Sequence, residues 1–301
     1  MCATRTGSDE LSVASEQGRI CALAARGQRD LRERADAHRG LFPAKPFDPA
    51  LFSTVSLATA FGAPWCTAEQ LRMSNRAALW VFGADWQVDY LAVEPAQVER
   101  MVQGCLAVAD GATPAADDQL GWFLAEIRDE LATAAGVGTL WPAWRTELRR
   151  MLTAMSREWA WKTAHRRAGA VALPTLDDYL DNADNFGSSW VNVSHWIYTA
   201  EPAELDELPR LTVAGRAVQR VLRLVNDLAT YDRDVSWGDL NALMLVGDRS
   251  ELVERIGTQV AEARELFEPL RGNCPRQVAY LSRQIGFSSG FYQLTDFWGG
   301  L

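Results

Sequence analysis

Three side chains that carry oxygen ligands lie four residues apart in the last third of the chain. They are Asn226, Thr230 and Asp234, within the segment Arg223-Leu-Val-Asn-Asp-Leu-Ala-Thr-Tyr-Asp-Arg-Asp234. If the segment is helical, each step of four residues advances by about 400°, so the three side chains fall within about 40° of one face. Hard oxygen ligands of this kind suit Mg²⁺. The segment therefore predicts part of a magnesium site, with an ordinary polar helix face as the alternative.

A second pair of candidate ligands, Asp85 and Asp89, lies in the aromatic-rich segment Leu79-Trp-Val-Phe-Gly-Ala-Asp85-Trp-Gln-Val-Asp89. Two like charges four residues apart destabilise a bare helix by a few tenths of a kcal/mol. A cation between the two carboxylates would reverse the sign of that interaction. This pair therefore favours a second group of metal ligands, 226 − 85 = 141 residues before the first group begins.

Both segments resemble the metal-binding motifs of class I terpene synthases, DDxxD and (N/D)DxxSxxxE, and the second is similar to the NDLxTYxRE form of bacterial diterpene synthases. Trp86 replaces the second Asp of the first motif, and Asp234 stands where the family normally has Glu. The resemblance implies three Mg²⁺ ions, bound together with the substrate diphosphate by Asp85, Asp89, Asn226, Thr230 and Asp234. Because Asp is one methylene shorter than Glu, we expect longer or water-bridged coordination at Asp234.

Three further segments extend the resemblance over nearly the whole chain, to bacterial diterpene synthases of the labdane-related type. They are Tyr179-Leu-Asp-Asn-Ala-Asp-Asn-Phe-Gly-Ser188, Gly238-Asp-Leu-Asn-Ala-Leu243 and Gly290-Phe-Tyr-Gln-Leu-Thr-Asp-Phe297. The resemblance implies a C20 allylic substrate, a copalyl-type bicyclic diphosphate. A separate class II diterpene cyclase would supply it, because the sequence contains no DxDD motif. A sesquiterpene synthase acting on farnesyl diphosphate is the alternative.

Candidate diphosphate contacts flank the second motif. Arg223 and Arg233 offer guanidinium donors that suit phosphate oxygens, with surface salt bridges as the alternative. Many sesquiterpene synthases carry a pyrophosphate-sensing Arg just before a helix break, and Ala183 or Asp184 stands at that place here. The missing Arg favours a diterpene substrate. Asn182 and Asn185 are weaker candidates for contacting the diphosphate.

Aromatic side chains stabilise carbocations by cation–π attraction of roughly 0.5–2 kcal/mol per ring, and the chain has 12 Trp residues. Candidates for lining a cavity lie near the first motif, around a helix break at Gly187 and Ser188, and at the C-terminus. They are Phe61, Trp80, Phe82, Trp86, Phe186, Trp190, Phe291, Tyr292 and Trp298. The alternative for each of them is ordinary packing in a helical core.

One acidic cluster matches DDxxD letter for letter, through Asp177, Asp178 and Asp181. It follows Pro174-Thr175, however, and acids in the first turn after a proline are typical of a helix start, where they interact favourably with the helix dipole. We therefore expect these carboxylates on an exposed first turn rather than at a metal.

Apolar residues recur at three- and four-residue steps along most of the chain, and alternating strand patterns are hardly present. This periodicity predicts helices over residues 16–37, 67–93, 95–110, 117–135, 142–167, 175–198, 203–208, 213–234, 249–271 and 275–296. The expected fold class is all-α, and the resemblance implies the class I terpenoid synthase fold, a helical barrel around a central cavity. We expect residues 1–12 to form a mobile tail and residues 13–301 a single catalytic α domain.

The composition limits the classes of partner. A net charge of −9 and a pI near 5.0 lack the basic surface that nucleic acids and anionic membranes require. Five widely spaced cysteines without a C-x-x-C pair favour a reducing compartment over disulfides or zinc. No apolar run predicts a signal peptide or a membrane span. We expect a cytoplasmic protein that acts on a small molecule, with a homodimer left open.

Two rival classes explain less of the sequence. A trans-prenyltransferase has the same fold but needs two full DDxxD motifs, which Trp86 and Thr230 interrupt. A non-enzymatic helical module would explain the helices but not two acidic ligand sets at this spacing. The three histidines lie near no Gly-x-Ser-x-Gly elbow, so Ser/His/Asp catalysis is not indicated.

Overall fold

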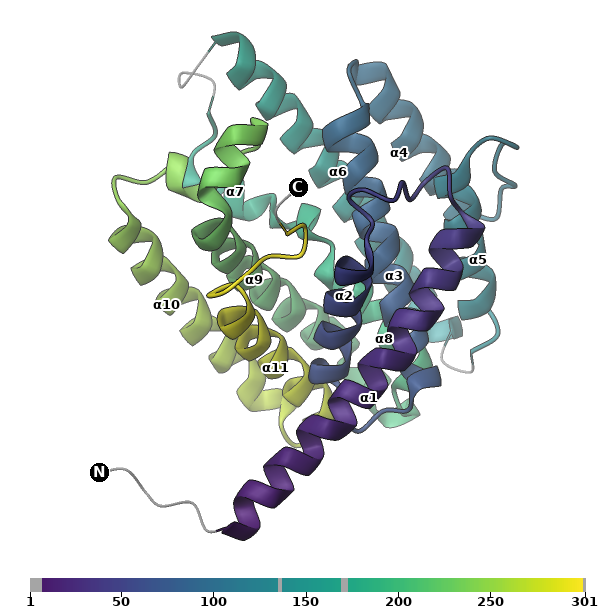
Figure 1. Ribbon diagram of the computed structural model, residues 1–301, viewed down its shortest axis with the longest axis vertical. Coiled ribbons are helices and arrows are strands. Elements are labelled where there is room, and N and C mark those ends of the chain that lie inside the picture. Colours follow the sequence, from purple (N-terminus) through teal and green to yellow (C-terminus); the bar gives the residue numbers. More distant parts are fainter. Residues whose placement is uncertain (1–6, 135–136, 169–172, 300–301) are drawn as a thin grey trace.

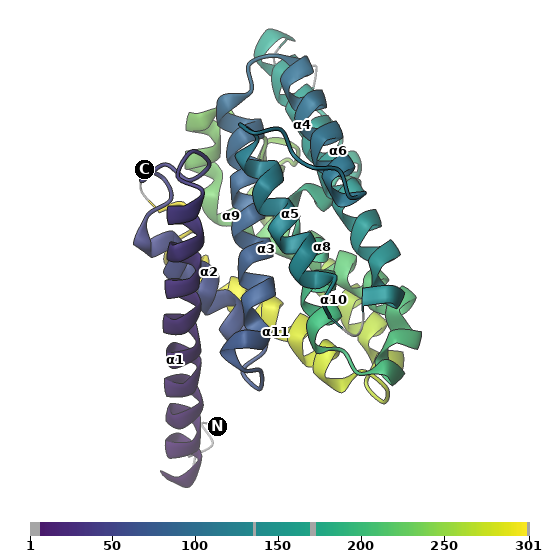
Figure 2. The same ribbon diagram turned by 90° about the vertical axis from the view of Figure 1, so that its right-hand side faces the viewer.

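The computed structural model describes residues 7–134, 137–168 and 173–299, and every regular element in these ranges is a helix, as predicted (Figures 1 and 2). The first half contains α1 (Gly7–Ala37), α2 (Pro49–Gly62), α3 (Ala68–Trp86), the π-helical η1 (Gln87–Leu91), α4 (Pro95–Ala109), α5 (Gln119–Leu131) and α6 (Val137–Ala168). The second half contains α7 (Leu176–Asp181), η3 (Ala183–Phe186), α8 (Ser188–Thr199), η4 (Pro202–Glu207), α9 (Leu208–Trp237), η5 (Ala242–Met244), α10 (Arg249–Phe267), η6 (Glu268–Leu270) and α11 (Pro275–Phe291).

Capping residues fix where the helices of the site begin and end. Asp48 starts α2, because its carboxylate accepts two backbone N–H groups at 2.8 and 2.9 Å and Pro49 follows at the first helical position. Thr67 and Gln70 form a capping box at the start of α3. α9 ends at Gly238, whose φ of +74° is a left-handed conformation that glycine adopts without strain.

Five helices close into a ring at the centre of the molecule. α2 packs on α3, α3 on α8, α8 on α9, α9 on α11, and α11 again on α2. α6 packs on α8 and also touches η1 and η3. Outside the ring, α1 covers α2 and α3, α5 covers α3, α4 lies on α5 and α6, and α10 covers α9. Figure 2 shows α1 running along one side of the body and extending beyond it at its N-terminal end.

The largest differences between the structure and the predicted elements are in three places. α2 is not among the predicted helices, because it is buried against α1, α3 and α11 and its sequence lacks a polar face. The helix predicted over residues 175–198 is divided into α7, η3 and α8, with Gly187 in a left-handed conformation at the break. Of the expected tail, residues 1–6 lie outside the described ranges, whereas residues 7–12 belong to α1.

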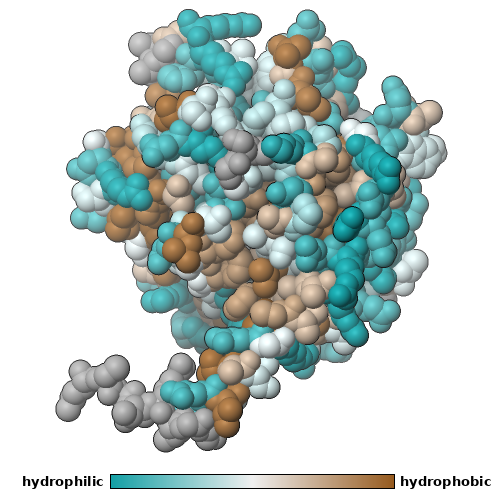
Figure 3. Space-filling model, viewed as in Figure 1, coloured by the Kyte–Doolittle hydropathy of each residue, from teal (hydrophilic) through white to brown (hydrophobic). Residues whose placement is uncertain are grey.

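The bulkiest part of the core lies between α3, α6 and α8. The rings of Trp80 and Trp190 lie 5.1 Å apart and those of Trp144 and Trp190 lie 5.5 Å apart, and all three side chains are fully buried. In the view of Figure 3, hydrophilic residues cover the periphery of the face, and apolar residues gather nearer its middle. None of the helices within the described ranges is long and apolar enough to cross a membrane.

Candidate active site

The ring of helices surrounds a cavity with a volume of about 250 Å³. Its lining residues come from all five ring helices, from α6, η1 and η3, and from residues 292–298 after α11. Carboxylates from α3, η1 and α9 face the same space as aromatic side chains from α3, α9, α11 and the C-terminal segment. The cavity therefore combines charged and apolar walls.

The first predicted ligand pair faces this cavity. Asp85 on α3 and Asp89 in η1 both line it, since side chains four residues apart share a helix face. Within the described part of the chain, the Asp85 carboxylate makes no hydrogen bond or ion pair. Burial, and then the charge of Asp89, raise the pKa of Asp85 well above its ordinary value, while Lys162 opposes the shift. The oxygen atoms of Asp85 are therefore available to a cation.

Asp89 has a protein partner that sequence reasoning missed. Lys162 of α6 donates to Asp89 Oδ1 at 2.7 Å and makes a second ion pair with Asp239, which follows the end of α9 and also lines the cavity. Burial alone would lower the pKa of Lys162, but the two carboxylates outweigh burial and raise it. The sequence feature that could have indicated this role is the position of Lys162, one of two lysines in the chain, within the aromatic stretch Trp159-Ala-Trp-Lys162.

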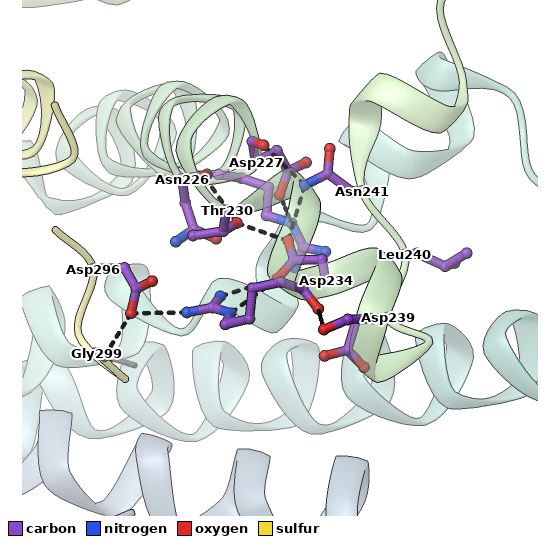
Figure 4. A network of polar contacts seen from close by, with 12 residues as sticks. Asn226, Asp227, Thr230, Asp234, Asp239, Leu240, Asn241, Asp296 and Gly299 are labelled. Carbon is purple, nitrogen blue, oxygen red and sulfur yellow. Dashed lines mark hydrogen bonds and ion pairs between the residues drawn. The ribbon is translucent and has the colours of Figure 1, made fainter. Parts of the chain in front are cut away.

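The second ligand set lies along one face of α9, as predicted (Figure 4). Asn226 and Asp234 line the cavity, whereas Thr230 is buried behind them. The Thr230 hydroxyl lies 2.7 Å from Asp234 Oδ2 and 3.0 Å from the carbonyl oxygen of Asn226. Asn241 donates to the same Asp234 oxygen at 2.9 Å. The short Asp234 side chain is thus held against its own helix.

Arg233 connects the second ligand set to the C-terminal segment through Asp234 and Asp296, both of which are labelled in Figure 4. Its guanidinium lies at the cavity, 3.0 Å from Asp234 Oδ1 and 2.8 Å from Asp296 Oδ1. The same group lies over the ring of Trp237, 5.0 Å from the ring centroid. Arg233 therefore presents a fixed positive charge beside the predicted metal ligands.

Arg223 also lines the cavity, but a buried network holds its donors. Its Nε donates to the Tyr179 hydroxyl at 2.7 Å, and its Nη2 donates to Glu158 at 2.8 Å. Tyr179 in turn donates to Asp227 at 2.8 Å, and burial raises the pKa of Asp227 to about 7. Asp227, the second residue of the motif, also lines the cavity, but its carboxylate joins α9 to α7 through Tyr179 and accepts a hydrogen bond from the backbone N–H of Ala242.

Asn182 is not a residue of the cavity, so its predicted contact with the diphosphate is not supported. Its side chain is buried, and its amide donates to the carbonyl oxygen of Ala154 at 2.9 Å. The physical reason is that Asn182 ends α7 and faces α6, not the ring interior.

The acidic cluster of α7 is exposed, with Asp177 and Asp178 on the first turn, as predicted, and Asp181 at the end of this short helix. The Asp177 and Asp181 side chains are 82% and 75% exposed. They pair with Arg255 and Arg220, while Asp178 accepts a hydrogen bond from the Thr175 cap. Neither Asp177, Asp178 nor Asp181 lines the cavity.

Four of the nine predicted aromatic residues line the cavity, and so does Ser188. The four are Phe82, Phe186, Tyr292 and Trp298. The structure also adds aromatic lining residues that were not predicted: Tyr90, Trp237, Tyr280, Phe287 and Phe297.

The other predicted residues are not among those that line the cavity, for identifiable reasons. Trp80 and Trp190 pack on each other in the core between α3 and α8. Phe61 and Phe291 support the lining residue Phe287 through ring contacts at 5.4 and 5.3 Å. Trp86 and Gly187 also lie outside the lining. Trp86 stacks on Tyr90 with ring centroids 4.3 Å apart, and Gly187 packs closely against α3 and α6.

The donor set fits Mg²⁺ if the substrate completes the coordination. Asp85, Asn226 and Asp234 offer hard oxygen atoms from α3 and α9. Among the described residues, no three His, Cys, Asp or Glu side chains come close enough to hold an ion by themselves. Mg²⁺ is commonly bound through one or two carboxylates together with substrate phosphates. The arrangement therefore suits a metal that binds together with a diphosphate.

A ring of helices around a cavity, with acidic groups on two of the helices and an aromatic lining, gives the chain the class I terpene synthase fold. Residues 78–267 match the family described as terpene synthase family 2, C-terminal metal binding, and this range contains both ligand sets. The chain belongs to this family. It is a lyase that ionises a prenyl diphosphate in a metal-dependent reaction and releases diphosphate.

Individual relatives are similar over most of the chain. Ent-pimara-9(11),15-diene synthase from Streptomyces sp. (strain KO-3988) is 24% identical over 274 residues, which cover 90% of each chain. (-)-Delta-cadinene synthase from Streptomyces clavuligerus is 25% identical over 226 residues, 72% of this chain and 65% of the relative. The solved structure of 2-methylisoborneol synthase from Streptomyces coelicolor A3(2), in complex with Mg²⁺ and 2-fluoroneryl diphosphate, covers 90% of each chain with a TM-score of 0.69 at 16% identity.

Proposed function

We propose that this terpene synthase is a Mg²⁺-dependent diterpene synthase, which ionises a C20 allylic diphosphate of the copalyl type and directs the rearrangement of the carbocation. The observation that carries the proposal is that Asp85, Asn226 and Asp234 open onto one aromatic-lined cavity. Ionisation produces a diphosphate with several negative charges and a cation that water would quench. The reaction therefore needs a charged wall and an apolar wall in the same space.

The charged wall would bind the leaving group. Asp85, Asn226 and Asp234 are the proposed Mg²⁺ ligands, with Thr230 supporting Asp234, in the three-ion arrangement that the sequence resemblance implies. Bound metal would act as a Lewis acid on the phosphate oxygens. Arg233 would donate charge-assisted hydrogen bonds, which are roughly twice as strong as neutral ones. Arg223 lies one turn before Asn226, and because its Nε and Nη2 donate to Tyr179 and Glu158, Nη1 is the donor that it would offer to the diphosphate. These residues hold the diphosphate so that the allylic end of the substrate points into the cavity.

The aromatic wall would shield and stabilise the carbocation. Phe82 packs edge-to-face on Trp298 at 5.2 Å and lies 5.6 Å from Phe297, so the C-terminal segment closes the cavity against α3. Rings held by their neighbours in this way present fixed π faces to a cation. The same packing excludes water from the reacting carbon atoms.

Two observations support a C20 substrate over a C15 substrate. The relative named for a pimaradiene, a C20 hydrocarbon, is similar over 90% of both chains, whereas the relative named for a cadinene, a C15 hydrocarbon, is similar over 72% and 65%. Ala183 or Asp184 stands at the place of the sensing Arg of sesquiterpene synthases, and neither is basic; the Asp184 carboxylate binds Arg150 at 2.7 Å and Gln219 at 3.0 Å. This position therefore offers no positive charge to a diphosphate.

The second candidate function is a sesquiterpene synthase that acts on farnesyl diphosphate, and the cadinene-forming relative favours it. The family match removes the non-enzymatic helical module, and the interrupted motifs argue against a trans-prenyltransferase. An upstream class II diterpene cyclase, a cytoplasmic location and a homodimer belong to the proposal as predictions.

Product analysis tests the proposal. The purified chain is incubated with Mg²⁺ and, separately, with copalyl-type, geranylgeranyl and farnesyl diphosphates, and the products are identified by mass spectrometry. We expect a C20 product from the copalyl-type diphosphate that disappears when EDTA removes the metal. Product from farnesyl diphosphate alone would establish the second candidate. No metal-dependent product from any of the three would contradict both.

A further inference from the structure

The most buried lysine of the chain joins two walls of the cavity. The Lys162 side chain is 2% exposed, and its ammonium group binds Oδ1 of Asp89 at 2.7 Å and Oδ1 of Asp239. Asp89 belongs to η1, and Asp239 follows α9. A buried ammonium group is stable only when carboxylates or other acceptors compensate its charge. Lys162 therefore depends on both carboxylates, and the structure fixes all three groups together.

The residue type suits a compact cation. Of the 30 Lys and Arg residues in the chain, two are lysines, and the other one, Lys45, is exposed. An arginine would present a wide planar fork, whereas the lysine ammonium group is a point charge with three donors that can turn toward separate acceptors. Asp89 and Asp239 line the cavity, but Lys162 does not. The lysine thus lies behind the two carboxylates and binds one oxygen of each.

Lys162 also limits the negative charge on this wall. Asp85, Asp89 and Asp239 all line the cavity, and the charges of Asp89 and Asp239 both act on Asp85. The single positive charge of Lys162 offsets one of these three negative charges, and the ammonium group engages one oxygen atom each of Asp89 and Asp239. A divalent cation that enters without diphosphate is therefore attracted less strongly by these carboxylates when Lys162 is present than it would be by three unpaired carboxylates.

We propose that Lys162 is a positioning residue that serves as the resident cation of this wall: it holds Asp89 and Asp239 as a bridged pair, leaves Asp85 as the free ligand, and makes Mg²⁺ binding depend on the diphosphate. The diphosphate brings the additional negative charge that the wall does not supply. This inference rests on the metal-dependent diphosphate chemistry of the proposed function, but not on the length of the substrate.

The test measures Mg²⁺ binding without turnover. Melting temperatures of wild type and Lys162→Met are followed during Mg²⁺ titration, with and without inorganic pyrophosphate, and isothermal calorimetry gives the Mg²⁺ affinity. For wild type we expect stabilisation only when Mg²⁺ and pyrophosphate are present together. For Lys162→Met we expect a lower melting temperature without metal and stabilisation by Mg²⁺ alone, with an affinity at least about tenfold above wild type.

Two further variants separate charge compensation from a merely structural role. Lys45→Met removes the exposed lysine and should leave the Mg²⁺ response unchanged. Lys162→Met combined with Asp239→Asn removes one charge of each sign. We expect this double variant to have a higher melting temperature than Lys162→Met and to lose most of the response to Mg²⁺ alone. If Lys162→Met does not fold, Lys162→Gln takes its place and is compared with the double variant in the same way.

The outcomes distinguish this inference from the proposed function. If wild type shows no joint response to Mg²⁺ and pyrophosphate, the metal site of the proposed function fails. If wild type responds jointly but Lys162→Met or Lys162→Gln shows the wild-type affinity for Mg²⁺ alone, the role of Lys162 is wrong while the proposed function stands.

Discussion

At the scale of single residues, the acids of the site differ in how strongly the protein already binds them. Asp85 makes no hydrogen bond or ion pair within the described ranges, Asp89 is bound by Lys162, and Asp234 accepts hydrogen bonds from Thr230 and Asn241. A sequence motif treats these acids as equivalent ligands. Their partners predict instead that Asp85 contributes most freely to a metal.

Asp85→Asn should therefore abolish turnover while the fold survives. The change removes a charged oxygen donor without removing core volume, so we expect kcat to fall by roughly a thousandfold, on the scale of losing one group that stabilises the transition state. Pyrophosphate release and the melting temperature measure the two effects. As the matched control, Asp178→Asn with Asp181→Asn alters the exposed cluster and should stay within about twofold of wild type. Near-normal turnover in Asp85→Asn would remove this residue from the site.

Asp234→Glu tests the departure from the family motif. The Asp234 carboxylate is held against α9 by Thr230, so a side chain one methylene longer should reach further toward an ion. We expect the Glu variant to remain active and to need less Mg²⁺ for half-maximal rate, whereas Asp234→Ala should be nearly inactive. The measurement is the rate as a function of Mg²⁺ concentration, and an active Ala variant would show that Asp234 is not a ligand.

Among the helices, α3 shows what helical periodicity can predict: which of its residues face the cavity and which face α8. Ala78, Phe82 and Asp85 line the cavity at three- and four-residue steps. Trp80 lies two residues before Phe82, or about 200° around the helix, so it faces α8 instead. Its position in the core was therefore predictable from the same period that predicts the helix.

Other features depend on packing between distant segments and could not be predicted from local patterns. Lys162 meets Asp89 across 73 residues, and only the contact of α6 with η1 brings them together. α2 is apolar without a polar face, since neighbours surround it. The all-α class was predictable, and so was the common side on which Asp85 and Asp89, and likewise Asn226 and Asp234, face the cavity, because these features rest on residue types at helical spacing.

Gly187, at the break between η3 and α8, should not tolerate a side chain. Its φ is +77°, and an added Cβ would lie 2.7 Å from Val81 Cγ1 and 2.9 Å from Met151 Sδ. Gly187→Ala should cost about 2 kcal/mol or more through backbone strain and overpacking. Gly286 lies in the middle of α11 with open space where a Cβ would be, so Gly286→Ala should instead raise the free energy of unfolding by about 0.5–1 kcal/mol. Urea unfolding compares the two, and equal stabilities would contradict the geometry.

At the scale of the whole molecule, stability should depend on pH through His195. Its ring is buried in α8 and stacks on Tyr280 of α11 at 4.8 Å, and burial lowers the pKa of His195 to about 4. The unfolded chain binds a proton below about pH 6.5, whereas the folded chain does so only near pH 4, so stability is lost as pH falls through this window.

The loss attributable to His195 is at most about 3 kcal/mol. His195→Phe keeps a ring against Tyr280 and removes the titrating group, so its free energy of unfolding should change less between pH 7 and pH 4.5 than that of wild type. Urea unfolding at the two pH values measures the difference. Parallel losses in both proteins would show that His195 is not responsible.

The same closed ring of helices shapes the cavity that selects the substrate. A bicyclic diphosphate is rigid and loses little freedom on binding, whereas a farnesyl chain must be ordered and would leave apolar volume unfilled. The most direct test of a diterpene synthase is therefore kcat/KM for a copalyl-type diphosphate against farnesyl diphosphate, with the same enzyme and Mg²⁺ concentration. We expect a ratio of at least about one hundred, equal to roughly 2.7 kcal/mol in transition-state binding. A ratio below one would contradict the diterpene assignment.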